Sequence, residues 1–271
     1  MHLDIRHLGA EKIHKKLPFV FELCKNYAGV DPTKEPIPVR PVVHYMMGGV
    51  HTNVNCETPM PGLYAIGECS CIGINGANRL GSNSLTELLV FGKRGGEAAA
   101  KYALSAGPLN KGAVEKLADA AAEGIRKKFL AKTDGKERIA ALRAEMGVTM
   151  EAGCGIYRTE SSLKTTYTKI AELRARFKDV TIDDRTNCYN TDLTAAIELD
   201  FMLEVAETIA GAALARTESR GAHQRTDFPK RDDAKFLKHT MVYRAGDGKP
   251  RIDYLPVVIT KWPQAERVYG K

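Results

Sequence analysis

Three short stretches between residues 40 and 92 carry side chains that could bind a charged or hydroxyl-rich ligand. Glu68 ends an apolar run, PGLYAIGE, which predicts a strand, and precedes a loop. An ionised carboxylate accepts hydrogen bonds and donates none, so Glu68 in this place suits the hydroxyl groups of a ribose or a ribityl chain. The alternative is a glutamate at the end of a strand that faces water.

Arg79 lies in GANRLGSNSL, among glycines and small polar residues that let a backbone approach a flat ligand closely. Ser82, Asn83 and Ser84 then precede an apolar helix. The free N–H groups of such a helix terminus suit an anion or the electron-rich edge of a ring. Arg79 could grip a carboxylate there with two parallel hydrogen bonds. A helix cap with a structural arginine would have the same spacing.

The third stretch, HYMMGG, places His44 and Tyr45 before two methionines and a glycine pair. His44 could hydrogen-bond a carboxylate. Taken in isolation, a packed core histidine is the commoner explanation of such a residue.

Four segments of different composition would position these side chains, and we predict a domain boundary between neighbours. They are residues 1–36, 37–107, 108–226 and 227–271. The first predicts a short strand, a helix over 17–27 and a turn at 30–32. The second mixes short apolar runs with Gly, Pro and Asn, which is typical of strands and loops, and it ends in a helix over 84–104.

The third segment has apolar residues at three- and four-residue steps along three stretches, which predicts three amphipathic helices. These positions are Ile139, Leu142, Met146 and Met150, then Leu163, Tyr167, Ile170 and Phe177, and finally Leu193, Ile197, Val205, Ile209 and Ala213. Thr191 and Asp192 form a helix start signal, and Gly153 and Gly155 separate the first two helices. Short loops between them predict a three-helix bundle.

The fourth segment contains two strand-like runs, LKHTMVYR and RIDYLPVVIT. Gly246, Asp247 and Gly248 lie between them and predict a hairpin turn.

The motif ESRGAH follows the third helix and contributes Glu218, Arg220 and His223. These residues could form a cofactor entrance or an interface. We favour a salt-bridged helix end that packs on the neighbouring domain. We also expect the charge cluster in RDD to pair locally.

The composition, 44% hydrophobic and 27% charged over 271 residues, is that of a soluble globular protein and excludes a disordered or collagen-like chain. No stretch approaches the roughly 18 apolar residues of a membrane span, and the first residues lack the apolar core of a signal peptide. The six cysteines do not have the spacing of a disulfide scaffold. No pair near Cys69 and Cys71 completes a zinc set, so we expect reduced thiols and no metal site.

The net charge of +7 is concentrated near the C-terminus, because residues 216–271 contain thirteen Lys or Arg and seven Asp or Glu. Acids are interleaved with the basic residues and no stripe of aromatic and basic residues appears. This pattern argues against nucleic-acid binding and favours a solvated face or a docking surface for an acidic partner subunit.

Several motifs together resemble the flavoprotein subunit of the fumarate reductase and succinate dehydrogenase family. They are LDIRHLGAEKI, VDPTKEPIPVRPVVHYMMGGV, GLYAIGECS, GANRLGSNSL, MEAGCGIYRT, ESRGAHQRTDFP, RDDAKFLKHT and AERVYG. Each is weak evidence alone, but their order and spacing are specific. MEAGCGIYRT and the short tail are most similar to bacterial fumarate reductase.

The resemblance implies interconversion of fumarate and succinate by hydride transfer with FAD. It implies that His44 and Arg79 are catalytic and bind the dicarboxylate substrate. It further implies that Glu68 bonds FAD hydroxyls and that Ser84 and Leu85 face the flavin ring with their backbones. The charges and donors of these residues are suited to orienting and polarising a dianion.

The family's dinucleotide-binding motif G-x-G-x-x-G, its H-T-G segment for covalent flavin attachment and an arginine proton donor do not occur in this sequence. We therefore expect the C-terminal half of such a subunit, of mixed α+β and α/β class. It would comprise the end of the capping domain, part of the FAD domain, the bundle and a small α+β domain. Alone it should bind FAD poorly and not turn over.

The resemblance also implies an iron–sulfur subunit, membrane anchor subunits and quinone as partners, on the cytoplasmic face of the inner membrane. Three alternatives stay open. They are a succinate dehydrogenase subunit, L-aspartate oxidase, which shares H-Y-x-x-G-G and G-A-N-R-L, and a non-catalytic docking module.

Overall fold

The computed structural model describes residues 1–246 and 250–265 and divides the chain into two compact units. The first unit is Met1–His44 and the second begins at Tyr45. Mixed helices and small sheets build both units, as expected for the α+β and α/β class. None of the helices in the described ranges is both long enough and apolar enough to cross a membrane.

The first unit is a small helical unit closed by a two-stranded sheet. Strands β1 (His2–Leu3) and β2 (Ile37–Pro38) pair antiparallel, so the start and the end of the unit meet. Between them lie η1 (Arg6–Leu8), α1 (Ala10–Lys16), α2 (Pro18–Leu23) and η2 (Cys24–Ala28). The predicted helix over 17–27 is thus confirmed as α2 continued by η2. Ile13, Cys24 and Ile37 are buried apolar residues of this unit.

The Gly- and Asn-rich segment of the second unit contains little regular structure. Strands β3 (Val50–His51) and β4 (Ser70–Cys71) form a parallel pair, and α3 (Asn83–Ser105) follows, where a helix over 84–104 was predicted. The strand predicted for PGLYAIGE was wrong, because this run makes only an isolated antiparallel bridge between Glu57 and Tyr64. An apolar run becomes a strand only where a neighbouring strand offers a continuous ladder of backbone groups.

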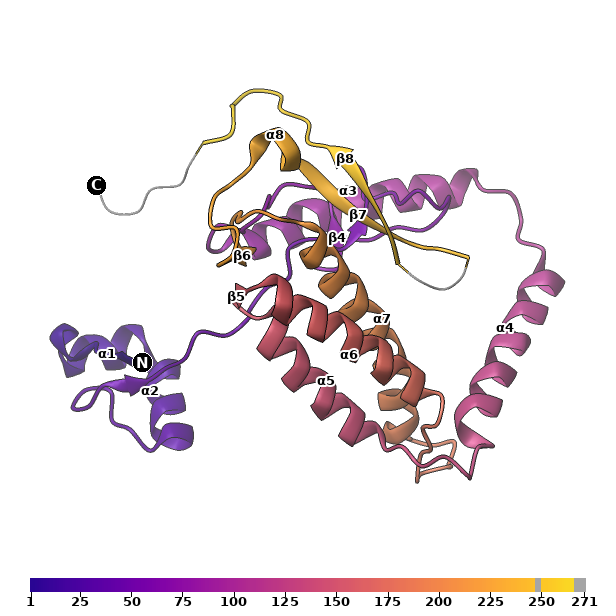
Figure 1. Cartoon of the computed structure of the whole chain (residues 1–271), viewed down its shortest axis with the longest axis horizontal. Coiled ribbons are helices and arrows are strands. Elements are labelled where there is room, and N and C mark those ends of the chain that lie inside the picture. The colour runs from indigo at the N-terminus through magenta and orange to yellow at the C-terminus, as the bar shows by residue number, and fades with distance from the viewer. Residues whose placement is uncertain (247–249, 266–271) are drawn as a thin grey trace. The chain divides into compact units, whose positions relative to one another are not determined.

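Helices α5 (Ile139–Cys154), α6 (Glu160–Phe177) and α7 (Thr191–Ala215) pack on one another and confirm the predicted three-helix bundle (Figure 1). Thr159 starts α6 through a capping box, and the Asn190 side chain accepts from the Leu193 N–H at 2.7 Å to start α7. Their shared core contains Phe129, Leu142, Met146, Ile170, Leu173, Phe177, Val180, Ile182, Ala196, Leu199, Leu203 and Ala206.

The bundle differs from the prediction in three places. Val205 is 46% exposed, because the buried stripe of α7 runs through Leu199, Leu203 and Ala206 and leaves Val205 to its side. The loop between α6 and α7 is longer than expected, and it returns Val180 and Ile182 to the core. Helix α4 (Lys111–Ile125), which continues into η3 (Arg126–Leu130), was not predicted, and no residue of α4 is buried.

Gly153 explains how closely α5 and α6 approach each other. A Cβ at this position would overlap the Thr166 hydroxyl and approach the Ser162 carbonyl oxygen at 2.8 Å. The predicted break at Gly153 and Gly155 is confirmed, since α5 ends at Cys154.

The C-terminal part begins with β6 (Gln224–Arg225), which pairs parallel with β5 (Tyr157–Arg158). Helix α8 (Asp233–Phe236) leads into an antiparallel pair, β7 (Lys238–Arg244) and β8 (Pro250–Pro256). The predicted hairpin is confirmed, although Asp247 and Gly248 of its turn lie outside the described residues. All six cysteines are free, as the sequence predicted.

Candidate functional site

The HYMMGG and GECS stretches lie side by side, although about twenty residues separate them in the sequence. The Val50 N–H donates to the Cys69 carbonyl oxygen at 2.8 Å and starts the β3–β4 pair. Gly49, with φ of 129°, makes this approach possible, because a Cβ there would lie 2.5 Å from the Cys69 carbonyl oxygen. Two of the three motifs predicted to bind ligand are therefore parts of one surface.

Glu68 is exposed, and its side chain joins these two stretches. One carboxylate oxygen accepts a hydrogen bond from the Met46 N–H at 3.1 Å. Neither interpretation of Glu68 from the sequence included this contact. The glutamate supports the residues that directly follow His44 and Tyr45.

Arg79 is half-buried, and its guanidinium group lies over the ring of Tyr45 at 4.5 Å from the centroid. One terminal nitrogen donates to the Leu80 carbonyl oxygen at 3.0 Å. The Nε–H is buried and has no hydrogen-bond partner among the described residues. An unpaired buried donor on a cationic group is costly, which favours an acceptor supplied by a ligand or by another part of the site.

The hydroxyl of Tyr45 is hydrogen-bonded to Glu87 of α3. The Tyr45 hydroxyl donates to Glu87 Oε2 at 3.0 Å, and the Asn75 amide donates to the same oxygen at 2.8 Å. Glu87 is only 3% exposed. Burial, together with the hydrogen bond to Glu87 and the charge of that carboxylate, raises the pKa of Tyr45 to about 12. Tyr45 is thus a neutral donor at physiological pH, and its ring is a fixed platform for Arg79.

The sequence interpretation missed Tyr45, Asn75 and Glu87. Glu87 did carry a signal, because it is an acid within the otherwise apolar run LTELLVFG. A carboxylate on a buried helical face requires donors, and the tyrosine of HYMMGG and the asparagine before GANRL supply them.

The N-terminus of α3 has no side-chain cap. Ser82 adopts a left-handed conformation with φ of 64°. Ser84 is half-buried, and Leu85 is 66% exposed. An uncapped terminus beside an exposed leucine fits one wall of a site for a flat, electron-rich ring.

The cavity next to Glu87 is much smaller than such a ring. It measures about 20 Å³, enough for about one water molecule, and Met46, Gly48, Ser70, Cys71, Asn75 and Gly76 contribute to its lining. Glu68, Ser84 and Leu85 do not line this cavity.

His44 is exposed and is the last residue of the first unit. The structure describes the two units separately, so the pairing of His44 with Arg79 remains a prediction. Within the second unit, by contrast, Glu68, Arg79 and the start of α3 are joined through Met46, Tyr45 and Glu87.

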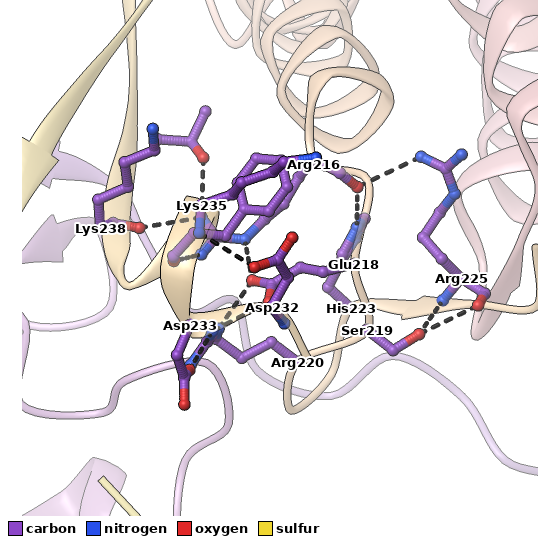
Figure 2. A network of polar contacts seen from close by, with 12 residues as sticks. Arg216, Glu218, Ser219, Arg220, His223, Arg225, Asp232, Asp233, Lys235 and Lys238 are labelled. Atoms are coloured by element: carbon purple, nitrogen blue, oxygen red, sulfur yellow. Dashed lines mark hydrogen bonds and ion pairs between the residues drawn. The ribbon is translucent and has the colours of Figure 1, made fainter. Parts of the chain in front are cut away.

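The ESRGAH motif forms a salt-bridged helix end, as predicted (Figure 2). Glu218 is fully buried and pairs with Arg216 and Arg220 at 2.8 and 2.7 Å. The predicted local pairing of the RDD charges is confirmed by Arg231 and Asp233, at 3.0 Å. Ala222 of the motif donates its N–H to the Ala77 carbonyl oxygen at 2.9 Å, so this helix end packs on the GANRL loop.

Comparison with known proteins agrees with the motif resemblance over the whole chain. The family model "Fumarate reductase flavoprotein C-term" matches residues 143–269, and the model "FAD binding domain" matches residues 1–85. The fumarate reductase flavoprotein subunit of Escherichia coli K12 is 55% identical over 100% of this chain and 45% of the relative. The succinate dehydrogenase flavoprotein subunit of Rickettsia felis is 40% identical over 98% of this chain and 47% of the relative.

The fold agrees equally well. A solved structure of E. coli quinol fumarate reductase superimposes with a TM-score of 0.93 and 53% identity, over 99% of this chain and 46% of that one. The chain spans about half the length of the relatives it matches. It belongs to the family of fumarate reductase and succinate dehydrogenase flavoprotein subunits.

Proposed function

We propose that this chain supplies the substrate-binding wall of a flavoprotein subunit that interconverts fumarate and succinate in anaerobic respiration. The observation that carries the proposal is Arg79, whose guanidinium is held against Tyr45 with its Nε–H unpaired, in a chain 55% identical to a fumarate reductase subunit. The higher identity to fumarate reductase than to succinate dehydrogenase, at 40%, favours the first name.

In this proposal Arg79 binds one carboxylate of the dicarboxylate substrate, and His44 binds the substrate as a second donor. A guanidinium offers two parallel N–H groups in the geometry of a carboxylate. Fixing both ends of fumarate orients its double bond and draws electron density from it, so proximity and electrostatics both lower the barrier. Tyr45 keeps Arg79 in place without adding a charge.

FAD, when bound, would exchange the hydride with the substrate carbon. The residues that would hold it are Glu68, through the ribityl or ribose hydroxyls, and the backbones of Ser84 and Leu85, at the open start of α3. Glu68 accepts one bond from Met46 and, as a carboxylate, has further acceptor sites for hydroxyl groups.

The proposed assembly includes an iron–sulfur subunit that takes electrons from the flavin, and membrane anchor subunits that exchange them with quinone. We place it peripherally on the cytoplasmic face of the inner membrane. The four proposed domains are the end of the capping domain (1–36), part of the FAD domain (37–107), the helical domain (108–226) and a small C-terminal domain (227–271).

The test uses a full-length chimera, in which this chain replaces the matching segment of the E. coli fumarate reductase flavoprotein subunit. Arg79→Ala should lower fumarate turnover by about 10²- to 10³-fold while the thermal unfolding midpoint changes little. Arg143→Ala, at an exposed arginine of α5, is the control and should retain turnover. Near-normal turnover of Arg79→Ala would contradict the proposal.

The same chimera separates the alternatives. Turnover of fumarate or succinate with a copurifying iron–sulfur subunit supports this proposal, and the ratio of the two rates distinguishes reductase from dehydrogenase. Turnover of L-aspartate without that partner would indicate L-aspartate oxidase. A folded chimera without flavin would indicate a docking module. The chain expressed alone should be colourless and inactive.

A further inference from the structure

A tight turn in the ESRGAH motif contacts the loop that contains Arg79. The Arg220 N–H donates to the His223 carbonyl oxygen at 2.8 Å, and the His223 N–H donates back at 3.0 Å, so Gly221 and Ala222 form the tip. The Ala222 N–H then donates to the Ala77 carbonyl oxygen at 2.9 Å. Ala77 lies two residues before Arg79.

Gly221 is required at this tip for two independent reasons. Its φ is +56°, in the left-handed region that favours glycine. A Cβ would also overlap the Ala77 carbonyl group and lie 2.8 Å from the Ala77 Cβ. The backbone of the turn therefore touches the backbone of the Arg79 loop with no space left for a side chain.

Buried charges fix one side of the turn (Figure 2). Glu218 accepts from Arg220 Nε at 2.7 Å, from Arg216 Nε at 2.8 Å and from the Asp232 N–H at 2.8 Å. Arg220 extends further to Asp233, at 2.7 Å. Several hydrogen bonds that share one buried carboxylate permit a single arrangement of these side chains, because any other would leave buried charges unpaired.

A neutral histidine fixes the other side. His223 Nδ1 lies 3.0 Å from Arg158 Nη1, and His223 Nε2 lies 3.0 Å from the Arg216 carbonyl oxygen. Arginine can only donate, so Nδ1 accepts and Nε2 carries the proton that bonds Arg216. Burial, with the nearby arginine charges, holds the pKa of His223 below its ordinary value and keeps this tautomer neutral.

The turn thus has rigid supports on both sides, whereas the loop that it touches has few. Ala77 lies between Gly76 and the exposed Asn78. Among the described residues, the side chain of Arg79 makes one hydrogen bond, to the Leu80 carbonyl oxygen of its own loop.

We propose that the turn formed by Arg220, Gly221, Ala222 and His223 is a positioning element for Arg79, in which Glu218 and Gly221 act through the Ala77 carbonyl group. The turn sets the path of residues 76–82 and so the direction in which the guanidinium faces the substrate. This inference rests on the proposed function of Arg79.

The test compares Gly221→Ala with Gly29→Ala. Gly29 has nearly the same conformation, with φ of +66°, but nothing lies within 4 Å of its would-be Cβ. The control thus reproduces the backbone strain and omits the contact with Ala77. Glu218→Gln, which keeps the shape and removes the charge, is the second variant in case Gly221→Ala does not fold.

Two measurements are made on each variant. Hydrogen exchange of the chain alone should show faster exchange at residues 76–82 in Gly221→Ala and in Glu218→Gln, and not in Gly29→Ala. In the flavin-loaded chimera, the first two variants should raise the KM for fumarate between about tenfold and a hundredfold, because small misplacements of a binding group are costly. Flavin content should stay unchanged.

Arg79→Ala is assayed alongside to keep the two failures apart. An inactive Arg79→Ala together with control-like KM and kcat in Gly221→Ala and Glu218→Gln would overturn the positioning role and leave the proposed function standing. Normal turnover of Arg79→Ala would overturn the proposed function itself.

Discussion

The three-helix bundle and the Gly- and Asn-rich segment stabilise their backbones in different ways. In the bundle, Leu142, Ile170 and Leu199 are fully buried, and each helix contributes to one apolar core. In the segment, Arg79 is held by the ring of Tyr45, and the Ala77 carbonyl group is held by a turn more than 140 residues later. The bundle is stabilised by its own side chains, whereas the candidate site depends on polar contacts from elsewhere in the chain.

The two kinds of contact suit two tasks, which are to build a scaffold and to orient one binding side chain. Apolar packing is non-directional and tolerates small adjustments, so it suits a scaffold. Hydrogen bonds are directional, so a few of them from rigid neighbours can fix the orientation of a single arginine side chain. Irregular segments that carry binding residues are commonly positioned in this way by a rigid scaffold.

The largest effect is expected from Glu218→Ala. Removal of the carboxylate leaves Arg216 and Arg220 without their buried partner, which typically costs about 3–5 kcal/mol. Urea unfolding of the chain would measure the loss. Glu123→Ala is the control, because Glu123 pairs with Arg126 at the surface, where the cost should be below about 1 kcal/mol. Equal losses in the two variants would mean that the buried network is not a support.

The next largest effect is expected in the bundle. Leu199→Ala should lower the free energy of unfolding by about 2–5 kcal/mol, because it leaves a cavity in the shared core. Leu85→Ala, at an exposed leucine of the candidate site, should change it by less than about 0.5 kcal/mol. A large loss from Leu85→Ala would show that the segment has its own apolar core after all.

Tyr45→Phe should have a smaller effect on stability and a clear effect on the site. It leaves Glu87 Oε2 with only the Asn75 donor, which costs about 1–3 kcal/mol. The phenylalanine ring still supports Arg79, so the chimera should keep part of its affinity for fumarate, whereas Tyr45→Ala should lose more. The KM of the two variants distinguishes the hydroxyl from the ring.

The smallest effect concerns pH. His223 and His239 both have a pKa below the ordinary value of 6.5, mainly because of burial. Their contribution to stability is therefore fully present above pH 6.5 and decreases as the pH falls through that value towards the pKa of the folded state. The bundle helices contain no histidine.

Hydrogen exchange followed from pH 7.5 to pH 5.5 would measure this dependence, after correction for the intrinsic pH dependence of exchange. Amides at residues 216–240 should lose protection, and those of α6 should not. His223→Gln should weaken the dependence without removing it, since His239 remains. An equal loss across both regions would contradict the assignment to the histidines.

The sequence predictions were more accurate for the three-helix bundle than for the Gly- and Asn-rich segment. The bundle was predicted well because burial repeats with the helical period, and only Val205 was placed on the wrong side. Helix α4 was missed although Val114, Leu117, Ala121 and Ile125 recur at helical spacing, so the sequence did carry a signal for it. The strand predicted for PGLYAIGE failed because strands need a partner that the run itself does not specify.

For the candidate site, the sequence predicts residue types but not the residues that support them, and the roles of His44, Glu68 and Arg79 stay predictions. Arg79 and Glu68 were chosen because charge and local glycines are visible in the sequence. Glu87 and the Gly221 turn were missed as supports, since their importance lies in what they touch.

The amino-acid sequence alone determined the chemistry available at residues 44, 68 and 79, the helical bundle and the family. Only the tertiary structure decided which residues contact one another. The guanidinium of Arg79 lies over the Tyr45 ring, the Tyr45 hydroxyl donates to Glu87, 42 residues later, and the Gly221 turn contacts Ala77. Local composition encodes periodicity and charge, because these act between neighbours in the chain. Hydrogen-bond partners brought together from distant segments leave no such pattern, because folding alone selects which of many donors meets a given acceptor.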